Sequence, residues 1–120
     1  MENKQKPVQE LSFLSAIRIV NYCEQLERLK KYSIGNQLIR SGTSIGANIT
    51  ESQHSESKAD FIHKMKIADK EAAETGYWLK ICNAINDFPN CEELIKDLIP
   101  IQKLLSVIIS RCKQNMKLNK

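Results

Sequence analysis

One set of polar side chains has the spacing of a single helix face. It consists of Arg40, Ser44, Asn48 and Glu51, which follow one another at intervals of four, four and three residues. A functional interpretation is a polar patch that contacts RNA or a protein partner. A structural interpretation is a network that ties this helix to the next one, with Arg40 paired to Glu71 or Glu74. Because the stripe borders an apolar face, we favour the structural interpretation.

The carboxylates and histidines do not complete a catalytic or metal site. Glu71 and Glu74 could act as a general acid and a general base, but no nucleophile, metal-ligand set or phosphate-binding loop accompanies them. His54 and His63 have no ligand companion at a helical spacing, so we expect both on the surface. The sequence therefore predicts a protein that is not an enzyme and binds no metal or cofactor.

Two aromatic residues and four cysteines are the remaining candidates for chemistry. Tyr77 and Trp78 could stack on bases, but their helical spacing beside other apolar residues predicts core or interface positions. No two cysteines form a C-x-x-C pair, so we expect neither a zinc site nor a redox motif. The cysteines are Cys23, Cys82, Cys91 and Cys112.

The composition fits one soluble helical domain. The chain has 120 residues, of which 42% are hydrophobic and 27% charged, a balance that excludes disorder. Four glycines and three prolines are too few for a β sandwich. The net charge of +4 permits nucleic-acid binding without requiring it. A polar beginning and the lack of a long apolar stretch predict a cytoplasmic protein with no membrane partner.

Apolar residues at spacings of three and four predict four long helices. We expect them at about residues 8–31, 34–52, 57–86 and 91–116. Ser33, Ser57 and Asn90 are the predicted N-caps, and Pro100 should kink the last helix. Short connections between long helices predict an all-α fold, an antiparallel up-down-up-down four-helix bundle that forms a single domain, residues 1–120.

The predicted helices carry more apolar surface than one bundle core needs. One apolar face of the first helix consists of Phe13, Ala16, Ile17, Val20 and Cys23. A neighbouring face adds Ile19, Tyr22, Leu26 and Leu29. Since monomers rarely expose large apolar patches, we expect a homo-oligomer with an apolar interface. In the second helix, Gly42 and Gly46 have the G-x-x-x-G spacing that lets another helix approach closely.

The expected topology gathers basic residues at one end of the bundle, which we call the basic end. Its candidate nucleic-acid-binding residues are Lys4, Lys6, Lys58, Arg111, Lys113, Lys117 and Lys120. In a ring of parallel subunits, these charges would add up to a surface that attracts phosphates. The alternative is that the lysines are solvated and only stabilise a helix end.

Two consecutive segments carry a recognisable motif. The first reads Gln37-Leu-Ile-Arg40-Ser-Gly-Thr-Ser44-Ile45-Gly-Ala-Asn48-Ile49-Thr-Glu51. The second contains Ser57, Asp60-Phe61, Lys64, Ile67-Ala68, Lys70-Glu71-Ala72, Glu74-Thr75 and Tyr77-Trp78-Leu79. Together they resemble the central motif of the four-helix-bundle proteins known as 23S rRNA intervening-sequence proteins. One departure is Ser52, where many members have glycine.

The resemblance implies a four-helix bundle assembled as a ring, usually a pentamer. A related branch, the accessory protein of diversity-generating retroelements, binds nucleic acid and a reverse transcriptase. For most members no biochemical activity is established. Two hypotheses follow: an oligomer that binds structured RNA, or nucleic acid with little sequence preference, through the basic end, and a scaffold that holds a protein partner without binding nucleic acid. The uneven charge distribution and the related branch favour the first.

Overall fold

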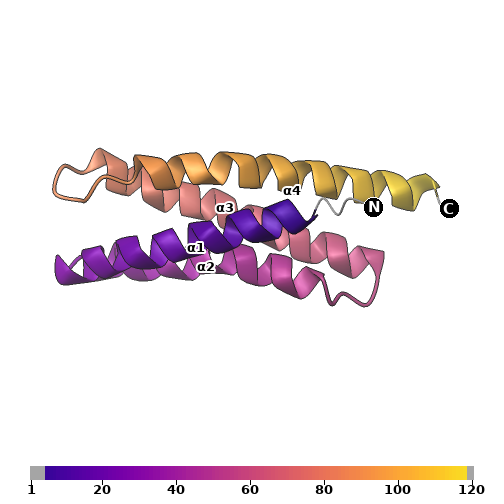
Figure 1. The fold of residues 1–120 in the computed structure, drawn as a ribbon, viewed down its shortest axis with the longest axis horizontal. Helices are drawn as coiled ribbons and strands as arrows, with labels where there is room; N and C mark the ends of the chain where they lie inside the picture. The colour runs from indigo at the N-terminus through magenta and orange to yellow at the C-terminus, as the bar shows by residue number, and fades with distance from the viewer. Residues whose placement is uncertain (1–4, 119–120) are drawn as a thin grey trace.

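The computed structural model describes residues 5–118, which form four helices. They are α1 (Gln5–Arg28), α2 (Tyr32–Ser52), α3 (Lys58–Ala84) and α4 (Glu92–Leu118). Consecutive helices run in opposite directions along a molecule of 54 × 22 × 22 Å (Figure 1). The described part of the chain contains no strand, so the predicted all-α four-helix bundle is confirmed.

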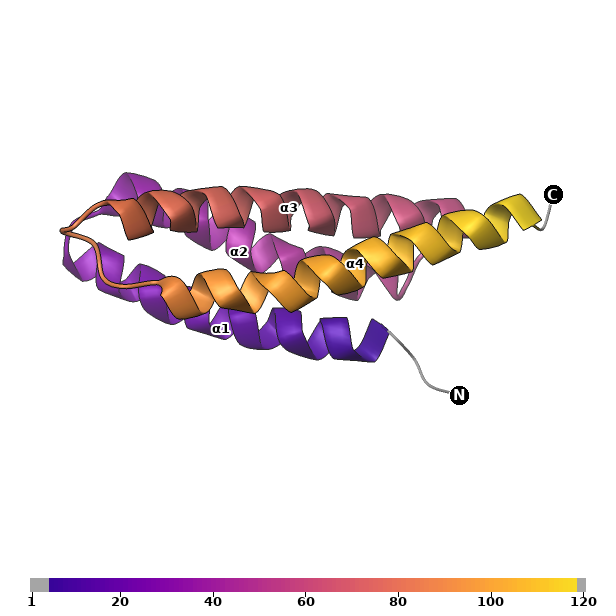
Figure 2. The ribbon, with the colours of Figure 1, turned by 90° about the horizontal axis from the view of Figure 1, so that it is seen from above.

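Each helix packs against two others. The closely packed pairs are α1–α2, α2–α3, α3–α4 and α1–α4. Within residues 5–118 the backbones of the diagonal pairs lie farther apart, although the side chains of Tyr22 of α1 and Cys82 of α3 approach each other across the core. Figure 2 shows that α4 runs obliquely to α3, with its last turns projecting beyond the other helices. Arg18 of α1 joins Asp97 of α4 through an ion pair of 3.0 Å between Nη1 and Oδ1.

The helix boundaries confirm two of the three predicted caps. The Ser57 hydroxyl accepts from the backbone N–H of Asp60 at 3.0 Å, and the Asn90 side chain accepts from that of Glu92 at 2.9 Å. The prediction for Ser33 is wrong, because α2 already begins at Tyr32. The reason lies in the preceding turn.

That turn ends α1 earlier than predicted. Lys30 has a φ of 62°, and the N–H of Lys31 donates to the carbonyl of Leu26 at 2.8 Å, which closes the helix end as a left-handed turn does. The chain therefore reverses in a few residues and leaves no room for a separate cap. At the other predicted irregularity, α4 is helical on both sides of Pro100, and the kink there stays a prediction.

The core follows the bundle axis, and it contains mainly one of the two predicted apolar faces of α1. Ile19, Tyr22 and Leu26 are buried, whereas Phe13 is 65% and Ile17 44% exposed. The buried face of α1 also includes two small polar residues, Ser12 and Ser15. Because of these serines, the buried face is not recognisable in the sequence as a continuous apolar stripe. Other fully buried side chains are Leu38, Ile45, Ile49, Met65, Leu79, Ile101 and Leu105.

The glycines of α2 mark its closest contact. A Cβ atom on Gly42 would lie 2.8 Å from both Cδ1 and Cγ2 of Ile19, and one on Gly46 would lie 3.3 Å from Oγ of Ser12. The close helix approach predicted from the G-x-x-x-G spacing is confirmed, and the approaching helix is α1.

Candidate nucleic-acid interface

The fold brings the predicted basic end together in part. The start of α1, the α2–α3 connection and the end of α4 lie at the same end of the bundle (Figure 1). The predicted residues that the structure describes there are all exposed: Lys6, Lys58, Arg111, Lys113 and Lys117. Lys4 and Lys120 lie outside the described residues.

These side chains do not form one patch. Arg111 and Lys113 are two residues apart in α4, so they project from nearly opposite sides of the helix. Lys113 and Lys117 are four residues apart and share a side. A basic residue of another helix lies near this pair.

The additional residue is Lys66 of α3. The ammonium group of Lys66 approaches that of Lys113, and this lowers the pKa of Lys113 below its ordinary value. The charge of Lys117 acts in the same direction. We call Lys66, Lys113 and Lys117 the lysine cluster. Within residues 5–118, no ion pair reaches any of its members.

The sequence analysis missed Lys66 because its position depends on the register between two helices. A Cβ atom on Gly76 of α3 would lie 3.6 Å from Cδ1 of Leu98 of α4, and Lys58 of α3 lines a hollow together with Cys112 of α4. These contacts set the antiparallel register of α3 and α4, in which the long side chains of Lys66 and Lys113 reach toward each other. The sequence shows the spacing within α4 but not this register.

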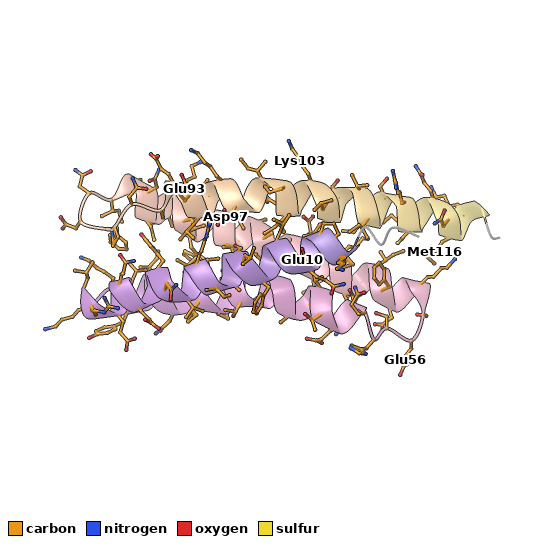
Figure 3. The ribbon with its side chains drawn as sticks, viewed as in Figure 1. Glu10, Glu56, Glu93, Asp97, Lys103 and Met116 are labelled. Carbon is orange, nitrogen blue, oxygen red and sulfur yellow. The ribbon has the colours of Figure 1, made fainter. Side chains whose placement is uncertain are left out.

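Three acidic residues near the basic end are engaged elsewhere or point away. Glu51 pairs with Lys64 at 3.2 Å, and the Asp60 carboxylate accepts from the backbone N–H of Glu56. The side chain of Glu56 projects outward from the α2–α3 connection (Figure 3). The three neighbouring positive charges of the lysine cluster favour a phosphate or another anion there.

The polar stripe of α2 divides into separate interactions. Arg40 donates to Glu71 at 3.2 Å and also to Glu74, joining α2 to α3. Ser44 donates to the carbonyl of Arg40 at 2.6 Å, and Asn48 donates to the carbonyl of Ser44 at 2.8 Å, so both remain within their own helix. The fourth member, Glu51, pairs with Lys64 as described above.

The carboxylates beside Arg40 are held in place rather than free to react. Trp78 Nε1 donates to Glu74 at 3.0 Å. This hydrogen bond, followed by the Arg40 guanidinium, holds the pKa of Glu74 below its usual range. A further bond between α2 and α3, from Thr75 Oγ1 to Ser41 Oγ at 3.0 Å, is buried and was not predicted.

The remaining candidate residues are the histidines, the aromatic residues and the cysteines. His54 and His63 are exposed, as predicted, and Tyr77 is 59% exposed, so it does not belong to the core of this chain. Burial raises the pKa of Cys23 to about 11.

Among the residues that the structure describes, no group of three or more His, Cys, Asp or Glu side chains is placed to hold a metal ion. Within the same residues, no helix is long and apolar enough to cross a membrane.

An apolar surface lies on the opposite side of the molecule from α3 and α4. Hollows of about 300 and 180 Å³ follow the junction of α1 and α2, and we call them together the α1–α2 groove. Exposed apolar side chains border it, among them Phe13, Tyr32 and Ile39. This groove accounts for part of the surplus apolar surface of α1.

Comparisons with known proteins identify relatives of this chain. A crystal structure at 1.70 Å of a protein with unknown function from the S23 ribosomal protein family, from Bacteroides thetaiotaomicron VPI-5482, is 41% identical. It superposes with a TM-score of 0.84, over 90% of this chain and 99% of that one. None of the curated proteins matches. The profile of the 23S rRNA-intervening sequence proteins matches residues 4–107, and the chain therefore belongs to this family.

Proposed function

We propose that this protein is a non-enzymatic oligomer that binds nucleic acid, either structured RNA or nucleic acid of little sequence preference, through the basic end. The observation that carries the proposal is the lysine cluster, in which the charges of Lys66 and Lys117 both act on Lys113. Within residues 5–118, no acidic residue forms an ion pair with any of the three. Neighbouring like charges repel each other, and a phosphate between them would relieve that repulsion.

Self-association is part of the proposal. The α1–α2 groove exposes Phe13, Tyr32 and Ile39, which another copy of the chain would cover. The family resemblance implies a ring, and a pentamer is the assembly that we propose. Each copy would then contribute one lysine cluster, so that a modest net charge of +4 per chain would be multiplied on one assembly.

The test is fluorescence anisotropy of labelled RNA and duplex DNA with the purified protein at about 50 and about 200 mM salt. We expect affinity to fall steeply between the two, because phosphate contacts release counterions. The double change Lys113→Glu and Lys117→Glu should abolish binding. The matched control is Lys96→Glu with Lys103→Glu, two exposed α4 lysines outside the cluster, of which Lys103 points away from the bundle (Figure 3).

Two results would contradict the proposal. One is the absence of binding at the lower salt concentration. The other is an equal loss of affinity in the cluster variant and in the control variant, because the change in net charge is the same in both.

The α1–α2 groove favours a second candidate, a protein-interaction scaffold. In that case the groove would hold a different protein, such as a polymerase, in place of another copy, and nucleic acid would not bind. A pull-down with the wild-type chain and Phe13→Ser distinguishes this candidate, because a groove-bound partner should be lost from the variant.

A further inference from the structure

A line of exposed residues follows the outer face of α3. Its members recur at alternating intervals of four and three residues, which keeps them on one side of the helix. We call it the α3 stripe: Ala59, His63, Lys66, Lys70, Ala73, Tyr77 and Lys80, all exposed. It holds three lysines, one histidine and one aromatic ring, and no acidic residue.

The acidic residues of α3 lie on the flanks of the helix instead. Asp60, Asp69, Glu71 and Glu74 are all partly buried. Glu71 and Glu74 receive Arg40 from α2, and Asp60 accepts a backbone N–H, so three of the four are already engaged. In the described part of the chain, no ion pair involves Lys66, Lys70 or Lys80.

The positive charge of the stripe continues onto α4. Lys66 belongs both to the α3 stripe and to the lysine cluster, where it meets Lys113. The stripe therefore forms an extension of the proposed phosphate-binding surface along the bundle. Lys66 and Lys80 are fourteen residues apart, or about 21 Å along the helix, which corresponds to about six phosphates at the 3.4 Å spacing of a stacked strand.

Tyr77 adds an exposed aromatic ring to this surface, and phosphate binding alone does not need such a ring. Its side chain is 59% exposed and lies between Lys70 and Lys80 in the stripe. Its ring meets that of Trp78 edge to face, with the centroids 5.3 Å apart, and Trp78 is in turn bonded to Glu74. The tyrosine ring is thus supported on one side while much of its surface remains open to solvent.

We propose that the α3 stripe binds a single-stranded segment of nucleic acid, with Tyr77 stacked on an unpaired base and Lys66, Lys70 and Lys80 on the phosphates. An exposed ring among lysines is the combination that single-strand binding uses, because every unpaired base offers a flat face. A duplex hides those faces within its own stack and would engage only the lysines. The inference rests on the proposed function and specifies the form of nucleic acid that the protein selects.

The experiment compares Tyr77→Leu, Tyr77→Phe and Ile99→Ala in the full chain. The control residue Ile99 is 48% exposed and lies in α4, outside the α3 stripe, the lysine cluster and the α1–α2 groove. Anisotropy is measured with a labelled unstructured oligothymidine and with a labelled duplex of equal length. Circular dichroism and light scattering establish that each variant has the fold and the assembly of the wild type.

We expect Tyr77→Leu to weaken oligothymidine binding by about tenfold or more, the usual effect of losing one aromatic stacking platform, and to leave duplex binding unchanged. Tyr77→Phe should retain wild-type affinity, because it keeps the ring, and Ile99→Ala should have no effect. Equal affinities of Tyr77→Leu and Ile99→Ala for the single strand would overturn the inference. So would a loss in Tyr77→Phe as large as in Tyr77→Leu.

The outcomes also separate this inference from the proposed function. If Tyr77→Leu binds the single strand normally while reversal of Lys113 and Lys117 abolishes binding, the stacking role is wrong and the phosphate surface remains. If the wild type binds neither oligothymidine nor duplex at low salt, both ideas fail.

Discussion

Gly42 of α2 and Ile19 of α1 are in such close contact that a Cβ atom on the glycine would lie 2.8 Å from two carbons of the isoleucine. Real Cβ atoms do not tolerate that distance, so either the helices or the Ile19 side chain would have to move. We expect Gly42→Ala to lower the free energy of unfolding, because overpacking costs about 1–3 kcal/mol and the gain in helix propensity is about 1 kcal/mol or less. Urea unfolding measures the difference.

Gly76→Ala is the matched control. At that position the nearest atom to a Cβ would be Cδ1 of Leu98 at 3.6 Å, an ordinary van der Waals contact. The same substitution should therefore raise the free energy of unfolding by about 0.5–1 kcal/mol. If both variants were stabilised alike, the α1–α2 contact would be looser than described.

Nucleic-acid affinity should decrease with rising pH because of Lys113. In the free protein its pKa is lowered, mainly by Lys66, and a bound phosphate would raise it again. Binding then takes up protons in the pH range between the free and the bound pKa, so affinity falls as the pH rises through that range. Anisotropy titrations with DNA from about pH 7 to about pH 10, near the ordinary pKa of lysine, measure this dependence.

The variant Lys113→Arg isolates this effect. Arginine stays charged throughout the range, so the variant should bind at least as well at high pH and lose most of the pH dependence. An unchanged pH profile in Lys113→Arg would assign the proton uptake to another group.

Removing apolar side chains from the α1–α2 groove should dissociate the oligomer. Phe13→Ser with Ile39→Ser replaces two of its exposed apolar residues with polar ones. We expect light scattering to give a mass near that of one chain, 13.7 kDa, for this variant and a multiple of it for the wild type. The control is Val107→Ser, which alters an exposed apolar residue of α4. If only the control variant dissociated, the interface would lie on α4 and not in the α1–α2 groove.

The features that local chemistry determines could be predicted from the sequence. Ser57 and Asn90 accept from backbone N–H groups within three residues, and that geometry is encoded in a few adjacent positions. The predicted cap at Ser33 failed, because the left-handed turn at Lys30 ends one helix and lets the next begin at once.

Features that depend on packing between helices were harder to predict. The buried face of α1 includes Ser12 and Ser15, whereas the larger Phe13 is exposed, so hydrophobicity alone does not identify that face. Likewise Lys66 joins Lys113 only through the register of α3 against α4. The sequence located Gly42 as a contact point, but only the fold identifies Ile19 as its partner.

The order in which helices pack has a consequence for how the chain folds. Three of the four packed pairs, α1–α2, α2–α3 and α3–α4, join helices that are adjacent in the chain. Low contact order of this kind is typical of domains that fold in microseconds to milliseconds. The α1–α4 contact brings together the most distant segments, such as Arg18 and Asp97, which are 79 residues apart. Because closing such a long loop costs the most entropy, we expect this seam to form last and its amide hydrogens to exchange first.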